Sequence, residues 1–459
     1  MILKPPSFTL FASALQKYFF QLFQFYIIIF LLITRLPRND FKNKKIKHLA
    51  SNSYTMKIIF LLGLVSLFAD ITYESARSIS GPFLASLGAG VFLVSLTGGL
   101  GEFVGYGLRI LAGYISDRLK NYWLLTILGY FLGLFSLPLL AFTQKREFAI
   151  ALILIERLGK AIRSPARDTI LSFASKNVGY GKGFAIHESL DQIGAVIGPF
   201  IISLILEKFG YKYSFISLFV PAIISFSFLI FAEKIYKREY KFSDLHGKEK
   251  DKTNWEKKEK EKEETDKRNK VGQWKKAPVV FFFVFSALTI FSSLNFQLIS
   301  YHMKLNGVKD FIIPQLFSLA MIVDALSAIP IGLIFDKMKD RWKLLVLVIM
   351  PISSILSSIF IFSSENFYIG CIIWGLYIGM TESVMRSSVA QITPEEKRGI
   401  FFGIFHTIYG ISFLVGSSVL GKIYPDTGKI LAFVFSSQIL SIFFLLLTML
   451  SLNTRSFQD

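Results

Sequence analysis

Cysteine is almost absent from this chain. Cys371 is the only cysteine among 459 residues, and it lies within an apolar run. A single thiol cannot form an intramolecular disulfide or a cysteine-ligated metal site, so both are excluded. The phosphate-binding patterns G-x-x-x-x-G-K-[S/T] and G-x-G-x-x-G are also missing, which argues against ATP as a direct energy source. We therefore expect no cofactor and no resident metal.

Acidic residues are the second scarcity. The chain has 32 Asp and Glu against 51 Lys and Arg, a formal net charge of +19. Such a charge could suggest a nucleic-acid partner, but the basic residues concentrate in short segments between apolar runs. That distribution is typical of cytoplasmic loops that face anionic lipid, so no nucleic-acid partner is expected.

Apolar residues, by contrast, are abundant. They make up 53% of the chain, which includes 48 Phe, and the mean hydropathy is +0.51. A soluble domain of this length could not bury so much apolar surface, so a lipid bilayer must be part of the solvent. The composition therefore predicts an all-α polytopic membrane protein.

The apolar runs fall into two sets of six. A helix that crosses a bilayer needs about 20 mostly apolar residues. Such runs cover 57–85, 92–115, 121–143, 147–170, 182–206 and 213–232, and then 277–303, 312–335, 343–362, 367–390, 399–421 and 429–452. We expect a six-helix half at 56–233, a charged cytoplasmic linker at 234–276 that acts as a solvated tether, and a second six-helix half at 277–459.

The first 55 residues do not fit this count. The stretch FASALQKYFFQLFQFYIIIFLLI is long enough for a thirteenth, N-terminal membrane helix, and a basic segment follows it. A signal peptide is a weaker alternative, because no small-residue cleavage site follows the run closely. We favour a third interpretation, translation that starts at Met56, because the twelve-helix body is complete without the extension 1–55.

One pattern occurs twice, each time directly after an apolar run. It reads GYISDRLKNYW at 113–123 and GLIFDKMKDRW at 332–342, and such agreement between distant segments indicates an internal repeat. Both copies, the linker and the other loops rich in Lys and Arg fall on one side of the predicted membrane. The positive-inside rule places that side in the cytoplasm, so we expect a protein of the cell membrane with both termini of the twelve-helix body cytoplasmic.

The two loops and the six–linker–six layout resemble the major facilitator superfamily. Each loop is similar to that family's signature G-x-x-x-D-[RK]-x-x-[RK]-[RK], and the resemblance covers the chain from Met56 to the C-terminus. Both copies depart from the full signature; in the first, Asn121 and Tyr122 stand where a basic pair is usual. ERLGKAIRSPARD at 156–168 also resembles uncharacterised prokaryotic members. The resemblance implies two six-helix halves that rock about a central cavity and expose it to one side at a time.

The resemblance also implies a gating role for the repeated loop. The residues concerned are Gly113, Asp117, Arg118, Gly332, Asp336 and Lys337. Asp117 would meet the N-terminal end of the eleventh helix at Arg398–Gly399, and Asp336 would meet the fifth helix near Gly181–Gly183. A carboxylate beside the positive end of a helix is stabilised by about 0.3–1 kcal/mol. These contacts would act as latches that form only when the cytoplasmic side is closed; the alternative is a loop anchored to lipid headgroups.

Ionisable side chains at membrane depth form the second group of candidates, because they are costly there and usually face a cavity or one another. In the first half they recur at i, i+4 and i+7 spacing, on shared helix faces. The candidates are Asp70, Glu74, Arg77, Glu102, Arg109, Glu156, Arg157, His187 and Asp191. One interpretation is that they pair off, for example Glu102 with Arg109 and Arg163 with Asp168, and merely hold the helices together.

For the set as a whole, acids outnumber bases near mid-depth. A surplus carboxylate in a low-dielectric site can carry a proton, so proton coupling is expected. We expect Asp191 with His187 to be the coupling pair, with Asp70 or Glu74 as the second candidate. The second half is sparser, and its candidates are Asp324, Glu382, Arg386 and His406.

Asp324 has no obvious partner on its own helix. The asymmetry suggests proton chemistry in the first half and more substrate contact by aromatic residues in the second. Trp374, Tyr377 and Tyr409 are such aromatics, although core packing is the stronger interpretation of each.

Two patterns in the fifth span are less informative. HESLD at 187–191 resembles the zinc motif HExxH, but it ends in Asp and lies in an apolar span, so no metal site is expected. GAVIGP at 194–199 resembles the G-x-x-x-G-P of the fifth helix of drug antiporters. Small residues allow close helix approach whatever the function, so this pattern favours efflux only modestly.

The sequence as a whole predicts a secondary active transporter and not an enzyme. We expect proton-coupled movement of a small molecule by a monomer, with efflux of a small amphipathic or cationic compound favoured. Proton-coupled uptake of a metabolite is the alternative within the class. A membrane receptor or signalling protein on the same fold is the alternative from another class.

Overall fold

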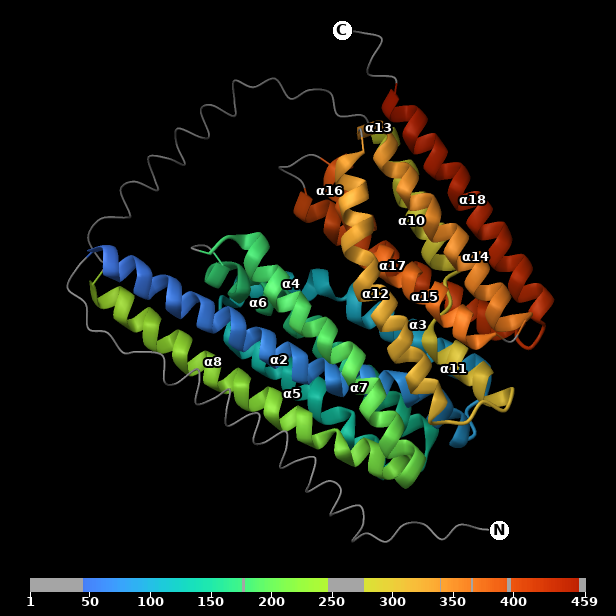
Figure 1. The fold of residues 1–459 in the computed structure, drawn as a ribbon, viewed down its shortest axis with the longest axis horizontal. Coiled ribbons are helices and arrows are strands. Elements are labelled where there is room, and N and C mark those ends of the chain that lie inside the picture. The colour runs from blue at the N-terminus through green and yellow to red at the C-terminus, as the bar shows by residue number, and fades with distance from the viewer. Residues whose placement is uncertain are drawn as a thin grey trace.

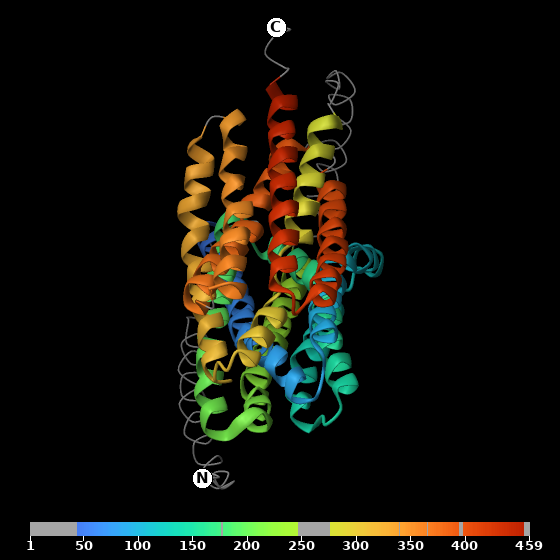
Figure 2. The ribbon, with the colours of Figure 1, turned by 90° about the vertical axis from the view of Figure 1, so that its right-hand side faces the viewer.

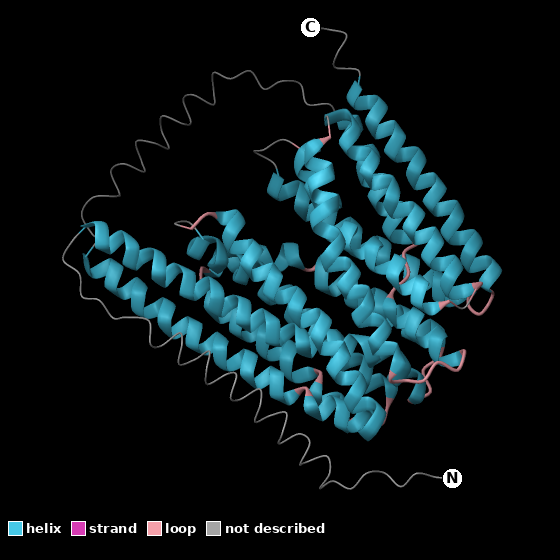
Figure 3. Cartoon of the chain, viewed as in Figure 1, coloured by secondary structure: helices cyan, strands magenta, loops and turns pink. Residues whose placement is uncertain are grey.

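The computed structural model describes residues 44–453 except 176–177, 247–275, 339, 365 and 394–397. Within these ranges the chain is helical, with short turns and no strands (Figure 3). The first half contains α2 (Lys44–Ser86), α3 (Val91–Glu102), η1 (Phe103–Gly107), α4 (Arg109–Leu119), α5 (Tyr122–Ser136), η2 (Pro138–Phe142), α6 (Arg146–Ser175), α7 (Tyr180–Ser217) and α8 (Phe219–His246). The second half contains α10 (Lys276–Phe291), α11 (Phe296–Leu305), α12 (Ile312–Lys337), α13 (Asp340–Lys343), η3 (Leu344–Val348), α14 (Ile349–Phe362), α15 (Phe367–Glu382), α16 (Val384–Ile392), α17 (Arg398–Ile423) and α18 (Thr427–Asn453).

These helices make twelve membrane crossings in the described part of the chain. Ten helical segments are long and apolar enough to span a bilayer, and one of them, Gly181–Arg238, has 58 residues. That segment crosses twice, because it reverses at Gly210, whose φ of 74° glycine adopts at little steric cost. The remaining crossing is α6, which has 30 residues and is too rich in charge to register by hydropathy. The predicted all-α fold with twelve crossings is confirmed.

Two helices extend beyond the predicted ends of the membrane spans. Helix α8 continues to His246, so the first part of the predicted linker 234–276 is helical. Helix α2 begins at Lys44, upstream of Met56. Residues 1–43 and 247–275 lie outside the described ranges, so the interpretation of the extension and the tether role of the linker stay predictions.

Two six-helix bodies make up the molecule (Figures 1 and 2). Each buries its own aromatic core; in the first half, for example, the rings of Phe68 and Phe228 stack at 5.9 Å. The end of the bundle where α8 ends and α10 begins is called the linker face below, and the other end the opposite face. The bodies are packed together near the opposite face, and their helices diverge toward the linker face, where α4 and α16 are well separated (Figure 1).

The seam between the two bodies is formed mainly by α2 with α11, α3 and η1 with α17, and α7 with α12, and α11 also contacts α3. Small residues allow the close approach: a Cβ at Gly99 would lie 2.7 Å from the Cβ of Ser417. Hydrogen bonds also cross the seam, since Ser95 Oγ donates to the Ser417 carbonyl at 2.7 Å and Ser318 Oγ to the Val196 carbonyl at 2.6 Å. The seam therefore closes the opposite face.

Three spans beside the seam depart from a regular α-helix. The second contains the π-helical turn η1, the tenth is interrupted at Ser383, and the seventh is unwound between Ser292 and Asn295. Non-helical backbone at membrane depth is tolerated only where protein buries it or where it lines a cavity. In the seventh span, Asn295 Oδ1 accepts from the Leu298 amide at 2.7 Å, and the Leu294 carbonyl accepts from Trp374 Nε1 at 3.0 Å. Hydrophobicity gave no sign of these interruptions.

Candidate functional site

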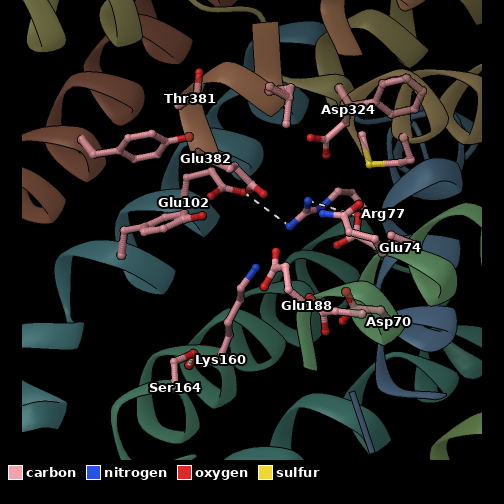
Figure 4. A pocket seen from close by; sticks show the side chains of 18 of the residues that line it. Asp70, Glu74, Arg77, Glu102, Lys160, Ser164, Glu188, Asp324, Thr381 and Glu382 are labelled. Atoms are coloured by element: carbon pink, nitrogen blue, oxygen red, sulfur yellow. Dashed lines mark hydrogen bonds and ion pairs between the residues drawn. The ribbon is translucent and has the colours of Figure 1, made fainter. Parts of the chain in front are cut away.

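A cavity of about 350 Å³ lies between the two halves, beside these interruptions (Figure 4). Its volume falls at the low end of small-molecule sites, which span about 300–1,000 Å³. Its acidic lining consists of Asp70, Glu74, Glu102, Asp168, Glu188, Asp191, Asp324 and Glu382, and its basic lining of Arg77, Arg109, Lys160, Arg163, Arg167 and Arg386. Carboxylates thus outnumber basic side chains in a site that both halves share.

A chain of buried ion pairs forms the wall on the side of the first half. Arg77 contacts Glu74 at 3.1 Å and Glu102 at 3.6 Å. Arg157 contacts the same Glu102 at 3.3 Å and Glu156 at 3.1 Å. Three carboxylates therefore share two guanidinium groups and tie α2, α3 and α6 together. Neither guanidinium is left without a carboxylate, so neither is readily available to an anionic substrate.

The predicted pair of Glu102 with Arg109 is wrong. Arg109 Nε donates to the Gly105 carbonyl at 2.9 Å, and its guanidinium lies 4.2 Å from the centre of the Tyr106 ring. The cause is the π turn η1, because one extra residue in a turn rotates the following helix by about 100°. Arg109 therefore leaves the helix face that carries Glu102.

The predicted pair of Arg163 with Asp168 is also wrong. Asp168 pairs with its neighbour Arg167 at 2.8 Å. Arg163 is buried between two aromatic rings, 4.7 Å from Tyr73 and 4.3 Å from Tyr130. Its Nε and Nη1 have no hydrogen-bond partner in the described part of the chain. Stacking on the electron-rich ring faces compensates the buried charge in place of a carboxylate.

The fifth span places the predicted coupling pair at the cavity. His187 and Asp191 both line it from α7, and Ser66 on α2 donates a hydrogen bond to Asp191 Oδ1. The close crossing of α2 and α7 depends on Gly198, where a Cβ would come within 2.8 Å of the Ile71 Cα. The glycines of GAVIGP therefore have a packing role, as their small size alone suggested.

The second half supplies a sparser wall. Asp324 from α12 and Glu382 from α15 point into the cavity (Figure 4), which Trp374 also lines. The Trp374 indole is also packed, with ring contacts to Phe296 at 5.5 Å and Phe317 at 6.1 Å. Trp374 therefore both lines the cavity and packs in the core of the second half.

Ten of the thirteen predicted proton-coupling residues line the cavity, and Glu156, Arg157 and His406 do not. Glu156 and Arg157 lie behind the wall in the ion-pair chain, and His406 stacks on Tyr106 with ring centres 5.6 Å apart. The cavity also contains charged residues that the candidate set omitted. They are Lys160, Arg163, Arg167, Asp168 and Glu188. Helical spacing from Glu156 could have identified the first three, which follow at i+4, i+7 and i+11 on one face of α6.

The repeated loop begins at the linker face in both halves. Gly113, Asp117 and Arg118 end α4, where Lys120 adopts the left-handed conformation with φ 51° and Asn121 caps α5. Gly332, Asp336 and Lys337 lie at the end of α12, at the matching positions of the second copy, but the residue that caps that helix, Met338, has an extended backbone. Asp117 is exposed and forms no hydrogen bond or ion pair with the residues described here, and the side chain of Asp336 lies outside them. The side chain of Arg398, the predicted partner of Asp117, also lies outside the described residues, and the gating role stays a prediction.

Comparison with known proteins decides the family. The family model of the Major Facilitator Superfamily matches residues 146–417. The chain belongs to the Major Facilitator Superfamily. An uncharacterised protein of Mycobacterium tuberculosis is 33% identical, with 80% of this chain and 87% of that protein covered. An uncharacterised transporter of this superfamily from Methanocaldococcus jannaschii is 27% identical, with 82% and 93% covered.

Solved structures agree with the superfamily fold. A transporter of the POT family, crystallised with 5-aminolevulinic acid, has a TM-score of 0.66 at 14% identity, covering 87% of this chain and 96% of that one. The superfamily and the twelve crossings together identify a multi-pass membrane transport protein, and they point away from an enzyme.

Superfamily membership makes the latch testable. Asp117→Asn removes the charge that would stabilise the positive end of α17 when the linker face closes. We expect transport to fall several-fold with expression nearly unchanged, and a cavity cysteine in a Cys371→Ser background to react faster with a reagent added at the linker face. Asp336→Asn should act in the same direction. Wild-type transport together with wild-type reactivity would remove the gating role.

Proposed function

We propose that this superfamily member is a proton-coupled secondary transporter, and that it exports a small amphipathic or cationic compound. The observation behind the proposal is the excess of carboxylates in the cavity between the halves. Ionised carboxylates that are buried without counter-charge are costly, so part of the set must be neutralised by protons or by a cationic ligand when the cavity closes.

The proposed orientation supports export as the direction of transport. Lys and Arg in the loops favour an orientation in which the linker face lies on the cytoplasmic side of a cell membrane, with both ends of the twelve-helix body on that side. The halves diverge toward this face, so the cavity would load from the cytoplasm in this conformation. Uptake of an anionic metabolite is less well supported, since carboxylates already engage Arg77 and Arg157. The protein would work as a monomer, with one cavity per chain.

Transport in proteoliposomes tests the proposal. Purified protein is reconstituted with an acidic lumen, and a panel of quaternary ammonium compounds, neutral aromatics and organic anions is added outside. Quaternary compounds are needed because weak bases accumulate in an acidic lumen without any protein. We expect quaternary ammonium members of the panel to accumulate, and to leak out when nigericin collapses the gradient.

Other outcomes discriminate the alternatives. Accumulation that requires an alkaline lumen, with the solute following the proton, would indicate proton-coupled uptake. Accumulation that does not depend on the pH gradient would contradict proton-coupled transport. So would a protein that still binds ligand but accumulates none of the compounds.

A further inference from the structure

Asp324 is unusual among the cavity carboxylates. Its side chain points into the cavity from α12, yet only 4% of the residue is exposed (Figure 4). It forms no ion pair and no side-chain hydrogen bond with any residue in the described ranges. Asp70, Glu188 and Glu382 likewise form no ion pair and no side-chain hydrogen bond in the described ranges, but each of them is more exposed than Asp324. Glu74 and Glu102 contact Arg77, and Asp191 accepts a hydrogen bond from Ser66. Asp324 is therefore a buried carboxylate whose counter-charge is missing.

The charged groups around Asp324 do not compensate it. Glu382 on α15, Glu188 on α7 and Glu74 on α2 face it with charge of the same sign, and Arg386 on α16 faces it with the opposite sign. Arg77 on α2 lines the same cavity but is engaged by its own two carboxylates. Arg386 forms no ion pair within 4 Å among the residues described. Carboxylates predominate among the charged groups around Asp324, so its surroundings do little to stabilise its ionised form.

The backbone leaves space for this carboxylate. On α15, a Cβ at Gly379 would lie 2.8 Å from Asp324 Oδ1, so any larger residue there would push the carboxylate aside. Trp374, five residues before Gly379 on the same helix, lines the same cavity, and its indole N–H already donates to the Leu294 carbonyl. The exposed part of Trp374 available to a ligand is therefore its ring. A carboxylate and an aromatic ring that line one cavity can together bind an organic ammonium group.

We propose that Asp324 binds either a proton or the ammonium group of an organic cation, with the ring of Trp374 lining the same cavity, so that the two ligands compete for one carboxylate. An organic cation is favoured over a metal ion because no group of three or more His, Cys, Asp or Glu in the described part of the chain could hold a metal. The inference rests on the proposed proton-coupled transport and names both its substrate class and its coupling residue.

Competition at one carboxylate produces exchange without a separate proton site. When the cavity is closed to both faces, Asp324 must be neutral, and either ligand satisfies that requirement. An empty, ionised Asp324 opposes closure, so the transporter returns only with a proton bound. One proton therefore moves one way for each monovalent cation moved the other way, and the step forms and breaks no bond other than O–H.

Binding in detergent tests the competition directly. The probe is benzyltrimethylammonium, which cannot titrate, and phenylmethanesulfonate is the anionic control. In wild-type protein the apparent Kd for the cation should weaken by up to about tenfold per unit fall in pH, because each bound cation displaces one proton. In weakly buffered solution, at a pH low enough for Asp324 to be protonated before the cation binds, binding should release close to one proton per cation bound.

Three variants make the result specific. Asp324→Asn should weaken cation binding at least tenfold, remove its pH dependence and release no proton. Trp374→Leu should weaken binding while preserving the pH dependence, since the carboxylate remains. Asp426→Asn is the matched control: it makes the same chemical change in the loop before α18, where Asp426 is exposed and pairs with Lys429 at 3.0 Å. It should behave as wild type.

The remaining outcomes of this binding experiment separate the role of Asp324 from proton-coupled transport itself. If proton release persists in Asp324→Asn but disappears in Asp191→Asn, the proton site lies in the fifth span and the inference is overturned, while proton-coupled transport stands. If the cation binds with wild-type pH dependence in both variants, Asp324 is not the shared site. If cation and proton compete at Asp324 in detergent but no pH gradient drives accumulation in proteoliposomes, the inference stands and the proposed transport function fails.

Discussion

Replacing Arg157 with methionine is expected to destabilise the protein more than any other single change to the described charges. Arg157 is only 4% exposed and holds Glu102 and Glu156 at 3.3 and 3.1 Å. Methionine fills a similar volume but leaves buried carboxylates without their counter-charge, which costs about 3–5 kcal/mol. We expect a marked fall in the detergent melting temperature measured by fluorescence-detected size exclusion, together with a lower yield of folded protein.

The same helix provides the control. Arg146 pairs with the adjacent Glu147 at 2.9 Å, but both side chains are largely exposed, so Arg146→Met should change the melting temperature little. Adding Glu156→Gln to Arg157→Met should restore much of the loss, because it removes the carboxylate that has no other cation. Equal melting temperatures for Arg157→Met and Arg146→Met would contradict the ion-pair chain described for the cavity wall.

A leucine at Gly99 is expected to abolish transport while leaving each half folded. Gly99 lies in the seam, where a Cβ would approach Ser417 Cβ to 2.7 Å and Leu414 Cα to 3.1 Å. A larger side chain therefore keeps α3 and α17 apart and prevents the opposite face from closing. Transport by alternating access requires that closure, so turnover should fall to background. In a Cys371→Ser background, a cysteine at Gln297 should become reactive to an impermeant maleimide added at the opposite face.

Helix α3 offers a matched position for comparison. No atom lies within 4 Å of a Cβ built at Gly90, and its backbone is extended, with φ −71°. Gly90→Leu should therefore transport normally and leave the Gln297→Cys reporter protected. Normal transport by Gly99→Leu would show that the seam is looser than described.

The crossings could be predicted from sequence because bilayer thickness fixes the length of each apolar run. The run predicted at 312–335, for example, became α12, Ile312–Lys337. The interruptions could not be predicted in this way. The π turn η1 and the unwound segment before Asn295 are stabilised by contacts with distant helices, such as the bond from Trp374 Nε1 to the Leu294 carbonyl. A window of hydropathy contains none of that information.

The site shows the same division. Counting along each span from its loops placed Asp70, Asp191 and Asp324 near the middle of the membrane, and all three line the cavity. Helical spacing assigned the wrong partners, since Glu102 pairs with Arg77 and Arg157 from two other helices. Pairing depends on how α2, α3 and α6 cross, and one extra residue in η1 was enough to move Arg109 away. The absence of a partner for Asp324 could be suspected from its own helix alone but established only with its neighbours in place.

The most direct test of proton–cation exchange is to use an outward cation gradient to drive protons into the lumen. Proteoliposomes are loaded with benzyltrimethylammonium at equal pH inside and outside, diluted into cation-free buffer, and followed with a lumenal pH dye. Coupling is thermodynamically reciprocal, so the outward cation gradient must draw protons in. A hundredfold gradient should acidify a weakly buffered lumen by up to about 2 pH units, since each tenfold ratio corresponds to about 1.4 kcal/mol. Asp324→Asn should give no acidification. Cation efflux from wild-type vesicles without any proton entry would contradict exchange at this cavity.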